Sequence, residues 1–278
     1  MKARLVGVLA LCIMFIVGCS QPPLPHPPVL LHLAGSTSLQ PLVRALASAY
    51  SERHKYASFE FTAVGSAGGL ELLRRGQADL ALVSRPLQPQ EELDISTGRP
   101  SLTSMVIAWD AVAIVVNQYN PVRQISSYQL RNLFEGQTLN WDELGSPVGE
   151  IVVASREDGS GTRTVFEQSV MRGHAVTSTA LVMPGSEAMQ RFIAEQPAAI
   201  GYLSMGVLGA GVATVAIDGI QPTQNSIEQA KYPLVRPFLL VYRDRLQSEV
   251  ADFLAFAASP AGQAIVRATY GGAGSMRP

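Results

Sequence analysis

Three short stretches of glycine and hydroxyl residues have the composition of an anion-binding site. Residues 35–38 read GSTS, residues 65–69 read GSAGG, and residues 158–162 read DGSGT, two positions after Arg156. Each stretch follows an apolar run and precedes a run with helical spacing, so each stands where a strand turns into a helix. Backbone N–H groups, hydroxyls and a guanidinium are the donors that a tetrahedral oxyanion accepts.

Taken one at a time, these turns have a simpler explanation. Ser, Thr, Asp and Gly are the ordinary residues of turns and helix N-caps. Three such junctions in one chain, with an arginine beside the third, favour convergence on a single ligand at the strand ends of an open α/β sheet. Arginine suits this role because its planar fork matches two oxygens and stays charged at physiological pH.

Other chemistries find no support in the sequence. A serine hydrolase needs a histidine near its nucleophile, and no GxSxG motif surrounds Ser66 or Ser160. The four histidines share no motif: His26, His32, His54 and His174. GxxxxGK[ST] is absent, and no histidine pair or usable cysteine has metal-ligand spacing. We therefore expect no enzyme activity, no cofactor and no metal.

The N-terminus has the features of a secretory signal. Lys2 and Arg4 precede an apolar run that is too short to span a membrane, which predicts a signal peptide over residues 1–18. The run ends in VGC, which resembles the bacterial lipobox and predicts lipidation of Cys19. The alternative is a signal peptide that merely contains a cysteine. Residues 19–30 are proline-rich and are expected to form an extended tether.

The composition narrows the class of protein further. Cys12 would leave with the signal and Cys19 would carry lipid, so the mature chain would hold together without disulfides. The formal net charge is −1 at pH 7 with no basic run, and we expect no nucleic acid as a partner. The chain beyond residue 30 is long enough for one large domain or two lobes.

Strands and helices are predicted to alternate along the chain, which indicates an α/β fold. Strands are expected at 30–35, 59–64, 78–84 and 151–157, with at least two more within 101–117. Helices are expected at 39–53, 68–75, 128–136 and 163–171.

Several longer motifs resemble the PstS-type phosphate-binding proteins of bacterial ABC importers. They are GSTSLQPL (35–42), VGSAGGLELL with GQADLALVSRPL (64–87), LRNLFEGQTLNWDELG (130–145), REDGSGT (156–162), AIGYLS (199–204), YPLVRPFLLVY (232–242) and FLAFAASPAGQAIV (253–266). They follow the family's order and span roughly residues 33–270.

The resemblance implies a two-lobed, periplasmic-binding-protein-like fold of type II. Each lobe would be a mixed sheet flanked by helices, and two chain crossings would form the hinge. The first lobe is expected to hold residues 31–116 and 219–278, and the second residues 117–218. The lobes would close on one phosphate ion.

The resemblance also assigns roles to residues of the three turns. Asp158 is expected to orient Arg156. The expected phosphate ligands are Thr37, Ser38, Ser66, Ser84, Arg85, Arg156, Ser160, Gly161 and Thr162. The sequence departs from the family pattern at Ser84, where many members have an aspartate that accepts the proton of hydrogen phosphate and repels sulfate. Serine carries no charge, which predicts weaker discrimination against sulfate; Arg85 either adds positive potential or forms a surface ion pair.

The function implied is that of a lipid-anchored, extracytoplasmic receptor that captures inorganic phosphate and delivers it to an ABC permease. It is expected to act as a monomer, anchored to the cell membrane or the outer membrane. Two alternatives remain open at this point. One is a surface sensor or adhesion protein with the same fold, and the other is a receptor for another oxyanion such as sulfate or molybdate.

Overall fold

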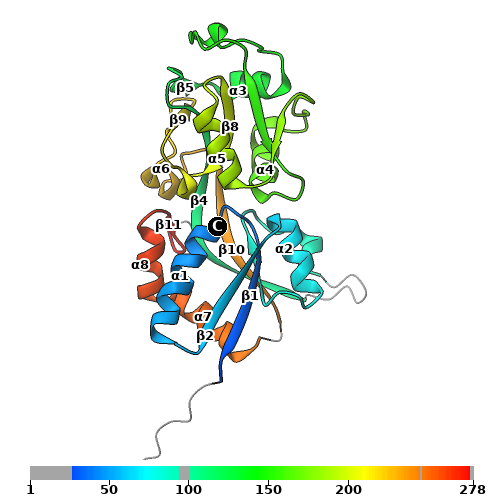
Figure 1. Cartoon of the computed structure of the whole chain (residues 1–278), viewed down its shortest axis with the longest axis vertical. Coiled ribbons are helices and arrows are strands. Elements are labelled where there is room, and N and C mark those ends of the chain that lie inside the picture. Colours follow the sequence, from blue (N-terminus) through cyan, green and yellow to red (C-terminus); the bar gives the residue numbers. More distant parts are fainter. Residues whose placement is uncertain (1–26, 94–100, 245, 276–278) are drawn as a thin grey trace, which may run out of the picture.

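The computed structural model describes residues 27–93, 101–244 and 246–275. The predicted signal peptide, Cys19 and most of the tether lie outside these residues. The chain forms two halves stacked along its longest axis, one built from the N- and C-terminal segments and the other from the middle of the chain (Figure 1). The predicted two-lobed α/β fold is thereby confirmed.

The lower half in Figure 1 contains a parallel three-stranded sheet with helices around it. Strand β1 lies between β2 and β3, and all three run in the same direction. The elements of this half before the crossing are β1 (Val29–Gly35), α1 (Gln40–Arg53), β2 (Ala57–Ala63), α2 (Gly65–Arg74), β3 (Leu80–Val83) and a 3-10 turn (Pro89–Glu91). After the crossing they are α7 (Ser248–Ala258), α8 (Pro260–Arg267) and β11 (Gly271–Gly272).

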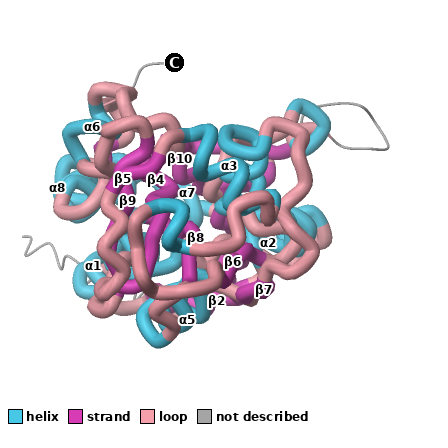
Figure 2. Tube along the Cα trace, turned by 90° about the horizontal axis from the view of Figure 1, so that it is seen from above, coloured by secondary structure: helices cyan, strands magenta, loops and turns pink. Residues whose placement is uncertain are grey.

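The upper half has its own sheet, in which β8 pairs with β6 and β6 with β7, all parallel. Its strands are β5 (Gln124–Ile125), β6 (Val152–Arg156), β7 (Leu181–Met183), β8 (Ala199–Ser204) and β9 (Val212–Ile217). Its helices are α3 (Ser127–Glu135), α4 (Gly161–Phe166), α5 (Ser186–Glu195) and α6 (Gln224–Glu228), with a π-helical turn (Glu167–Met171) and 3-10 turns (Trp141–Leu144, Met205–Val207). Seen from above, β4 lies near the middle beside β8 and β9, with α1, α6 and α8 to one side of these strands and α2 to the other (Figure 2).

Two long antiparallel strands, β4 (Leu102–Asn117) and β10 (Val235–Arg243), connect the halves. The expectation of at least two strands within 101–117 was wrong, because the segment is one continuous strand of 16 residues. Its N-terminal part pairs with β10, and its C-terminal part pairs with β8 and β9. An apolar run buried on both faces allows one strand to serve both sheets.

The hydrophobic cores show where one half gives way to the other. Ala108 and Phe238 pack into the lower core, whereas Ala111 and Leu234 pack into the upper one. We infer that the lobe boundaries lie inside β4 and β10, close to residues 110 and 236. The sequence analysis set them at residues 116 and 219, which lie near the C-terminal end of β4 and just beyond β9.

The other predicted elements are confirmed within a few residues. The 39–53 and 128–136 helices correspond to α1 and α3, and Gly136 ends α3 in the left-handed conformation expected of a C-terminal glycine. The helix predicted at 163–171 begins two residues earlier, at Gly161, and continues from Phe166 as the π-helical turn.

The first glycine turn is shaped by a close approach of two strands. Gly35, the last residue of β1, has a φ of +139°, and a Cβ at this position would lie 2.3 Å from the carbonyl oxygen of Leu82 in β3. The Ser36 N–H donates to that same carbonyl at 2.8 Å. Only glycine permits this contact, which directs residues 36–38 toward the junction of the two halves.

Gly35→Ala is expected to lower the free energy of unfolding by about 2–4 kcal/mol, because the methyl group meets main chain that cannot move aside. Urea unfolding followed by circular dichroism measures the change. Gly145→Ala is the matched control, since Gly145 also has a positive φ but a Cβ added there would have nothing within 4 Å. Equal losses in the two variants would show that conformational strain, and not the strand contact, explains the glycine.

Candidate functional site

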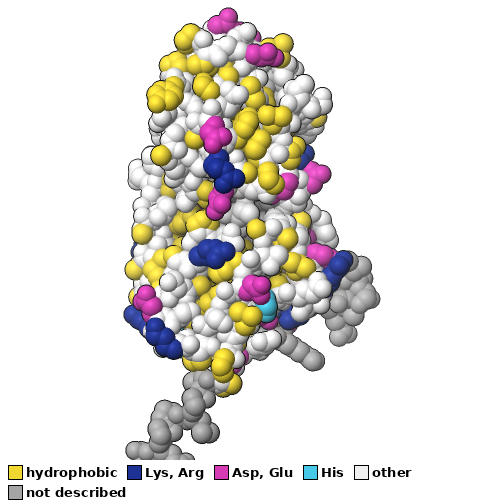
Figure 3. Space-filling model, viewed as in Figure 1, with side chains coloured by type: hydrophobic (Ala, Val, Ile, Leu, Met, Phe, Trp, Pro, Cys, Tyr) yellow, Lys and Arg dark blue, Asp and Glu magenta, His cyan; other side chains and the backbone are white. Residues whose placement is uncertain are grey.

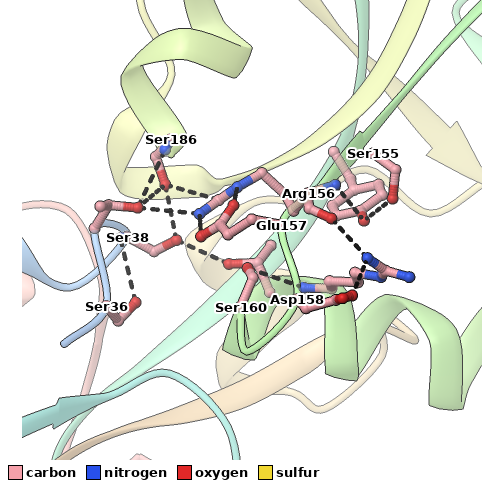
Figure 4. Close-up of polar contacts among 12 residues, drawn as sticks. Ser36, Ser38, Ser155, Arg156, Glu157, Asp158, Ser160 and Ser186 are labelled. Carbon is pink, nitrogen blue, oxygen red and sulfur yellow. Dashed lines mark hydrogen bonds and ion pairs between the residues drawn. The ribbon is translucent and has the colours of Figure 1, made fainter. Parts of the chain in front are cut away.

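The first and third glycine turns meet where the two halves adjoin (Figure 4). Thr37 and Ser38 come from the turn after β1, and Arg156 is the last residue of β6. One Arg156 amino group, Nη2, donates to Thr37 Oγ1 at 3.2 Å. The Ser38 hydroxyl lies 2.8 Å from that of Thr162, at the start of α4. Residues more than a hundred positions apart in sequence thus form one polar cluster.

Arg156 is almost fully buried and has several acceptors. Its side chain is 2% exposed and forms a two-pronged ion pair with Glu157, through Nε at 2.7 Å and Nη2 at 2.8 Å. Nη1 donates to Ser186 Oγ at 3.2 Å. The guanidinium is therefore held in one plane, with its two amino groups directed at hydroxyls of the cluster.

Ser186 stands at the centre of these contacts. Its hydroxyl lies 3.0 Å from that of Ser38 and 3.1 Å from that of Thr37, and its N–H donates to Thr37 Oγ1. It is the first residue of α5 and follows Gly185. The sequence analysis missed it, although MPGSEAM repeats the glycine–serine junction before a helix that marked the other turns.

The second turn contributes an adjoining set of serines in the lower half. Ser36 donates to Ser84 Oγ at 2.8 Å, and the Ser84 N–H donates to Ser66 Oγ at 3.1 Å. A Cβ on Gly161 would lie 2.5 Å from Ser66 Oγ and 2.7 Å from Ser84 Oγ. Glycine at position 161 therefore lets the start of α4 approach these hydroxyls across the junction.

A second buried arginine, which the sequence analysis missed, borders the cluster. Arg236 in β10 and Asp110 in β4 are both 0% exposed, and the guanidinium donates to Asp110 Oδ2 through Nε and Nη2. Its Nη1 donates to Thr162 Oγ1 at 2.8 Å. The available signal was a lone acidic residue in VIAWDAVAIVV and a lone basic residue in YPLVRPFLLVY, since single charges inside apolar strands need a partner.

Burial and pairing act against each other in this ion pair. Burial raises the pKa of the Asp110 carboxyl and lowers that of Arg236, while the attraction between the two charges and their hydrogen bonds opposes both changes. The positive charge of Arg156 also acts to lower the pKa of Arg236. Burial raises the pKa of Tyr202 to about 12, so its hydroxyl stays neutral where it accepts from the Arg156 N–H.

The role predicted for Asp158 does not agree with its contacts. Its side chain is 97% exposed and pairs with Arg163 at 2.7 Å, whereas the adjacent Glu157 pairs with Arg156. The reason lies in the turn, because Arg163 in α4 comes back toward β6 and donates to the Arg156 carbonyl oxygen. Glu157 is thus the carboxylate that orients Arg156.

Arg85 also points away from the cluster. Its two amino groups donate to the two carboxylate oxygens of Glu91 at 2.7 Å each, and its side chain is 6% exposed. Burial alone would raise the pKa of Glu91, but hydrogen bonds from Arg85 and the Gln88 N–H outweigh it and lower that pKa. Of the two interpretations offered for Arg85, its contacts favour an ion pair, and that pair is buried.

The remaining predicted residues lie in or beside the cluster. Ser160 is buried, and its hydroxyl caps α4 by accepting from the Arg163 N–H. The second and third turns touch directly, because the Ala67 N–H donates to the Gly159 carbonyl oxygen at 3.1 Å. All three predicted turns therefore converge, and Arg85 and Asp158 are the predicted residues whose side chains are directed elsewhere.

A pocket of about 440 Å³ opens beside Thr37 and Ser186, between the first turns of α1 and α5. Arg44 and Arg191 line it from opposite halves. Within the described ranges, no group of three or more His, Cys, Asp or Glu side chains is arranged to hold a metal ion. None of the described helices is long and apolar enough to cross a bilayer.

A two-lobed fold with buried donors from both lobes at one junction has the architecture of a two-lobed binding protein. Comparison with known families agrees, because residues 23–261 match the model of the PBP superfamily domain. The chain belongs to the PBP superfamily and, within it, to the PstS-type proteins.

Individual relatives support the same assignment. The phosphate-binding protein PstS of Bacillus subtilis is 30% identical over 205 residues, which cover 73% of this chain and 67% of that protein. A phosphate ABC transporter substrate-binding protein from Clostridium perfringens, solved with bound phosphate, is 32% identical with a TM-score of 0.80, covering 86% of this chain and 97% of that one. An ABC-type phosphate transport receptor from Vibrio cholerae is 31% identical with a TM-score of 0.69, covering 88% and 100%.

Proposed function

We propose that this protein captures inorganic phosphate between its two lobes and delivers it to an ABC permease. It works outside the cytoplasm, as PstS-type proteins do, and it binds its ligand without transforming it. The observation that carries the proposal is one connected polar cluster to which both lobes contribute. Arg156 donates to Thr37 and Ser186, and Ser38 links Ser186 to Thr162.

The hydrogen bonding of the cluster suits an anion. Thr37 Oγ1 accepts from Arg156 and from the Ser186 N–H, and Thr162 Oγ1 accepts from Arg236. A hydroxyl that already accepts from an arginine still has its hydrogen to donate, which is what an anion requires. A dehydrated phosphate needs many donors, because an unmet oxygen in a buried site is costly.

Phosphate should bind the fragment from residue 20 onward in a calorimetric titration, and Arg156→Ala should weaken binding by about 3 kcal/mol, roughly a hundredfold in Kd, because a buried charged partner is lost. Asp158→Asn is the matched control. That side chain is exposed and pairs with Arg163, so its Kd should change by less than about threefold. Failure of the unaltered fragment to bind phosphate would refute the proposed function.

Selectivity between phosphate and sulfate depends on whether an unpaired carboxylate faces the anion. Among the described residues, the carboxylates that contact the cluster are Glu157 and Asp110, and each is already paired with an arginine. At position 84 a serine hydroxyl accepts from Ser36, and a neutral hydroxyl does not repel a fully ionised oxyanion. This arrangement supports a site that tolerates sulfate as well as phosphate.

Sulfate should therefore bind detectably at millimolar concentration in the same titration. Ser84→Asp should weaken sulfate binding more than phosphate binding, because hydrogen phosphate can donate its proton to the new carboxylate and sulfate has none to give. Undetectable sulfate binding by the unaltered fragment would contradict this selectivity.

The membrane anchor and the partner belong to the same proposal. We propose that Cys19 carries the lipid, that the proline-rich residues between Cys19 and the start of β1 at Val29 tether the lobes to the membrane, and that the receptor docks on the permease as a monomer. We also propose that nucleic acid is not a partner. Figure 3 shows basic and acidic side chains mixed on the face in view and no continuous basic patch on that face, whereas a protein that binds nucleic acid has such a patch.

Labelling cells with a radioactive fatty acid should mark the protein in the membrane fraction. Cys19→Ser should abolish the label, because the thiol is the acceptor of the lipid, and Cys12→Ser should leave it unchanged. A labelled Cys19→Ser variant would rule out this anchor.

A further inference from the structure

Arg236 occupies the point where the two lobes meet. It is paired in register with Asp110 across β10 and β4, the two strands that cross between the lobes. Nε and Nη2 donate to Asp110 Oδ2 at 2.9 and 2.8 Å, and Ser204 donates to Oδ1 at 2.9 Å. The carboxylate is thus fully occupied, and it fixes the plane of the guanidinium.

The remaining nitrogen of Arg236 reaches both lobes. Nη1 donates to the carbonyl oxygen of Ser84, which follows β3 in the lower lobe, at 3.1 Å. It also donates to Thr162 Oγ1, in α4 of the upper lobe, at 2.8 Å. A single side chain on the connecting strands is thereby bonded to one residue of each half.

The contact with Thr162 determines what that hydroxyl can do. Arginine has no acceptor, so Thr162 Oγ1 must accept from Arg236 and direct its own hydrogen elsewhere. Its other neighbour in the cluster is the Ser38 hydroxyl at 2.8 Å. With Arg236 on one lone pair, Thr162 Oγ1 keeps its hydrogen and one further lone pair for the side where the hydroxyls of both lobes face each other, and either it or Ser38 can be the donor between them.

We propose that Arg236 is a positioning residue of the anion site, which acts through Thr162 and does not touch the anion. Held by Asp110, it keeps the Thr162 hydroxyl turned as a donor toward the ligand in the closed arrangement. This role rests on the proposed phosphate-binding function. A purely structural ion pair would affect the stability of the fold but would not be coupled to the Thr162 hydroxyl.

A double-mutant cycle on the folded fragment tests this coupling. Arg236→Lys keeps a positive charge beside Asp110, but its ammonium lacks the fork that reaches Asp110 and Thr162 together. Phosphate Kd is measured for the unaltered fragment, Arg236→Lys, Thr162→Val and the double variant. Thermal unfolding without phosphate reports the stability of each one. Arg131→Lys is the control, since Arg131 is part-buried and donates to the Val170 carbonyl oxygen outside the cluster.

Arg236→Lys should raise the phosphate Kd roughly tenfold when Thr162 is present, because one charge-assisted hydrogen bond to the donor is lost. In the Thr162→Val background, Arg236→Lys should raise the phosphate Kd by less than about twofold, since no hydroxyl remains to be positioned. Arg131→Lys should leave Kd unchanged. If Arg236→Lys does not fold, Arg236→Gln with Asp110→Asn replaces it, because the two changes together leave no buried charge unpaired.

An equal loss of affinity in both backgrounds, or no loss in either, overturns the positioning role while leaving phosphate binding by the unaltered fragment intact. No phosphate binding by the unaltered fragment overturns the proposed function and this role together. The two failures are therefore distinguished by the first titration of the series.

Discussion

The arrangement of this protein depends on burying two guanidiniums, those of Arg156 and Arg236, at the junction of the two lobes. Neither Arg156 nor Arg236 can lose its charge at physiological pH, and each is almost completely withdrawn from water. A buried charge is tolerated only with a partner and a full set of acceptors. Glu157 and Asp110 supply the partners, and hydroxyls from both lobes supply the remaining acceptors. The lobes therefore meet around the two arginines.

The crossing strands explain why the arginines can be shared between the lobes. Arg236 and Asp110 lie in register on β10 and β4, close to where the lower core ends and the upper core begins. Helix α4 reaches them from the upper lobe because Gly161 has no side chain to strike Ser66 and Ser84. The strand pair β4 and β10 thus holds Arg236 at the junction, while the C-terminal end of β6 brings Arg156.

Local patterns in the sequence identified the elements and the three turns, because strand ends, glycines and helix starts are encoded in neighbouring residues. They did not identify contacts made across the fold. Glu157 and Asp158 are adjacent, and only the return of Arg163 toward β6 decides which of them faces Arg156. Asp110 and Arg236 are 126 positions apart. Their pairing could be suspected from two isolated charges in apolar strands, but the hydrogen bond from Arg236 to Thr162 could not. The sequence analysis expected at least two strands where β4 is one, because 16 residues exceed the usual length of a strand and its exchange of β10 for β8 and β9 as partners depends on distant residues.

The charges of the cluster have a consequence for how it holds an anion. Each central arginine is matched by its own carboxylate, so the two ion pairs together contribute little net positive charge toward the divalent oxyanion that we propose as the ligand. Binding must then come from directed donors, namely hydroxyl hydrogens whose orientation the arginines impose. In such a site the geometry of each donor matters more than the count of charges. The ion pairs act mainly to keep those donors pointing inward, and the conformations of Thr37 and Thr162 become as important to recognition as Arg156 itself.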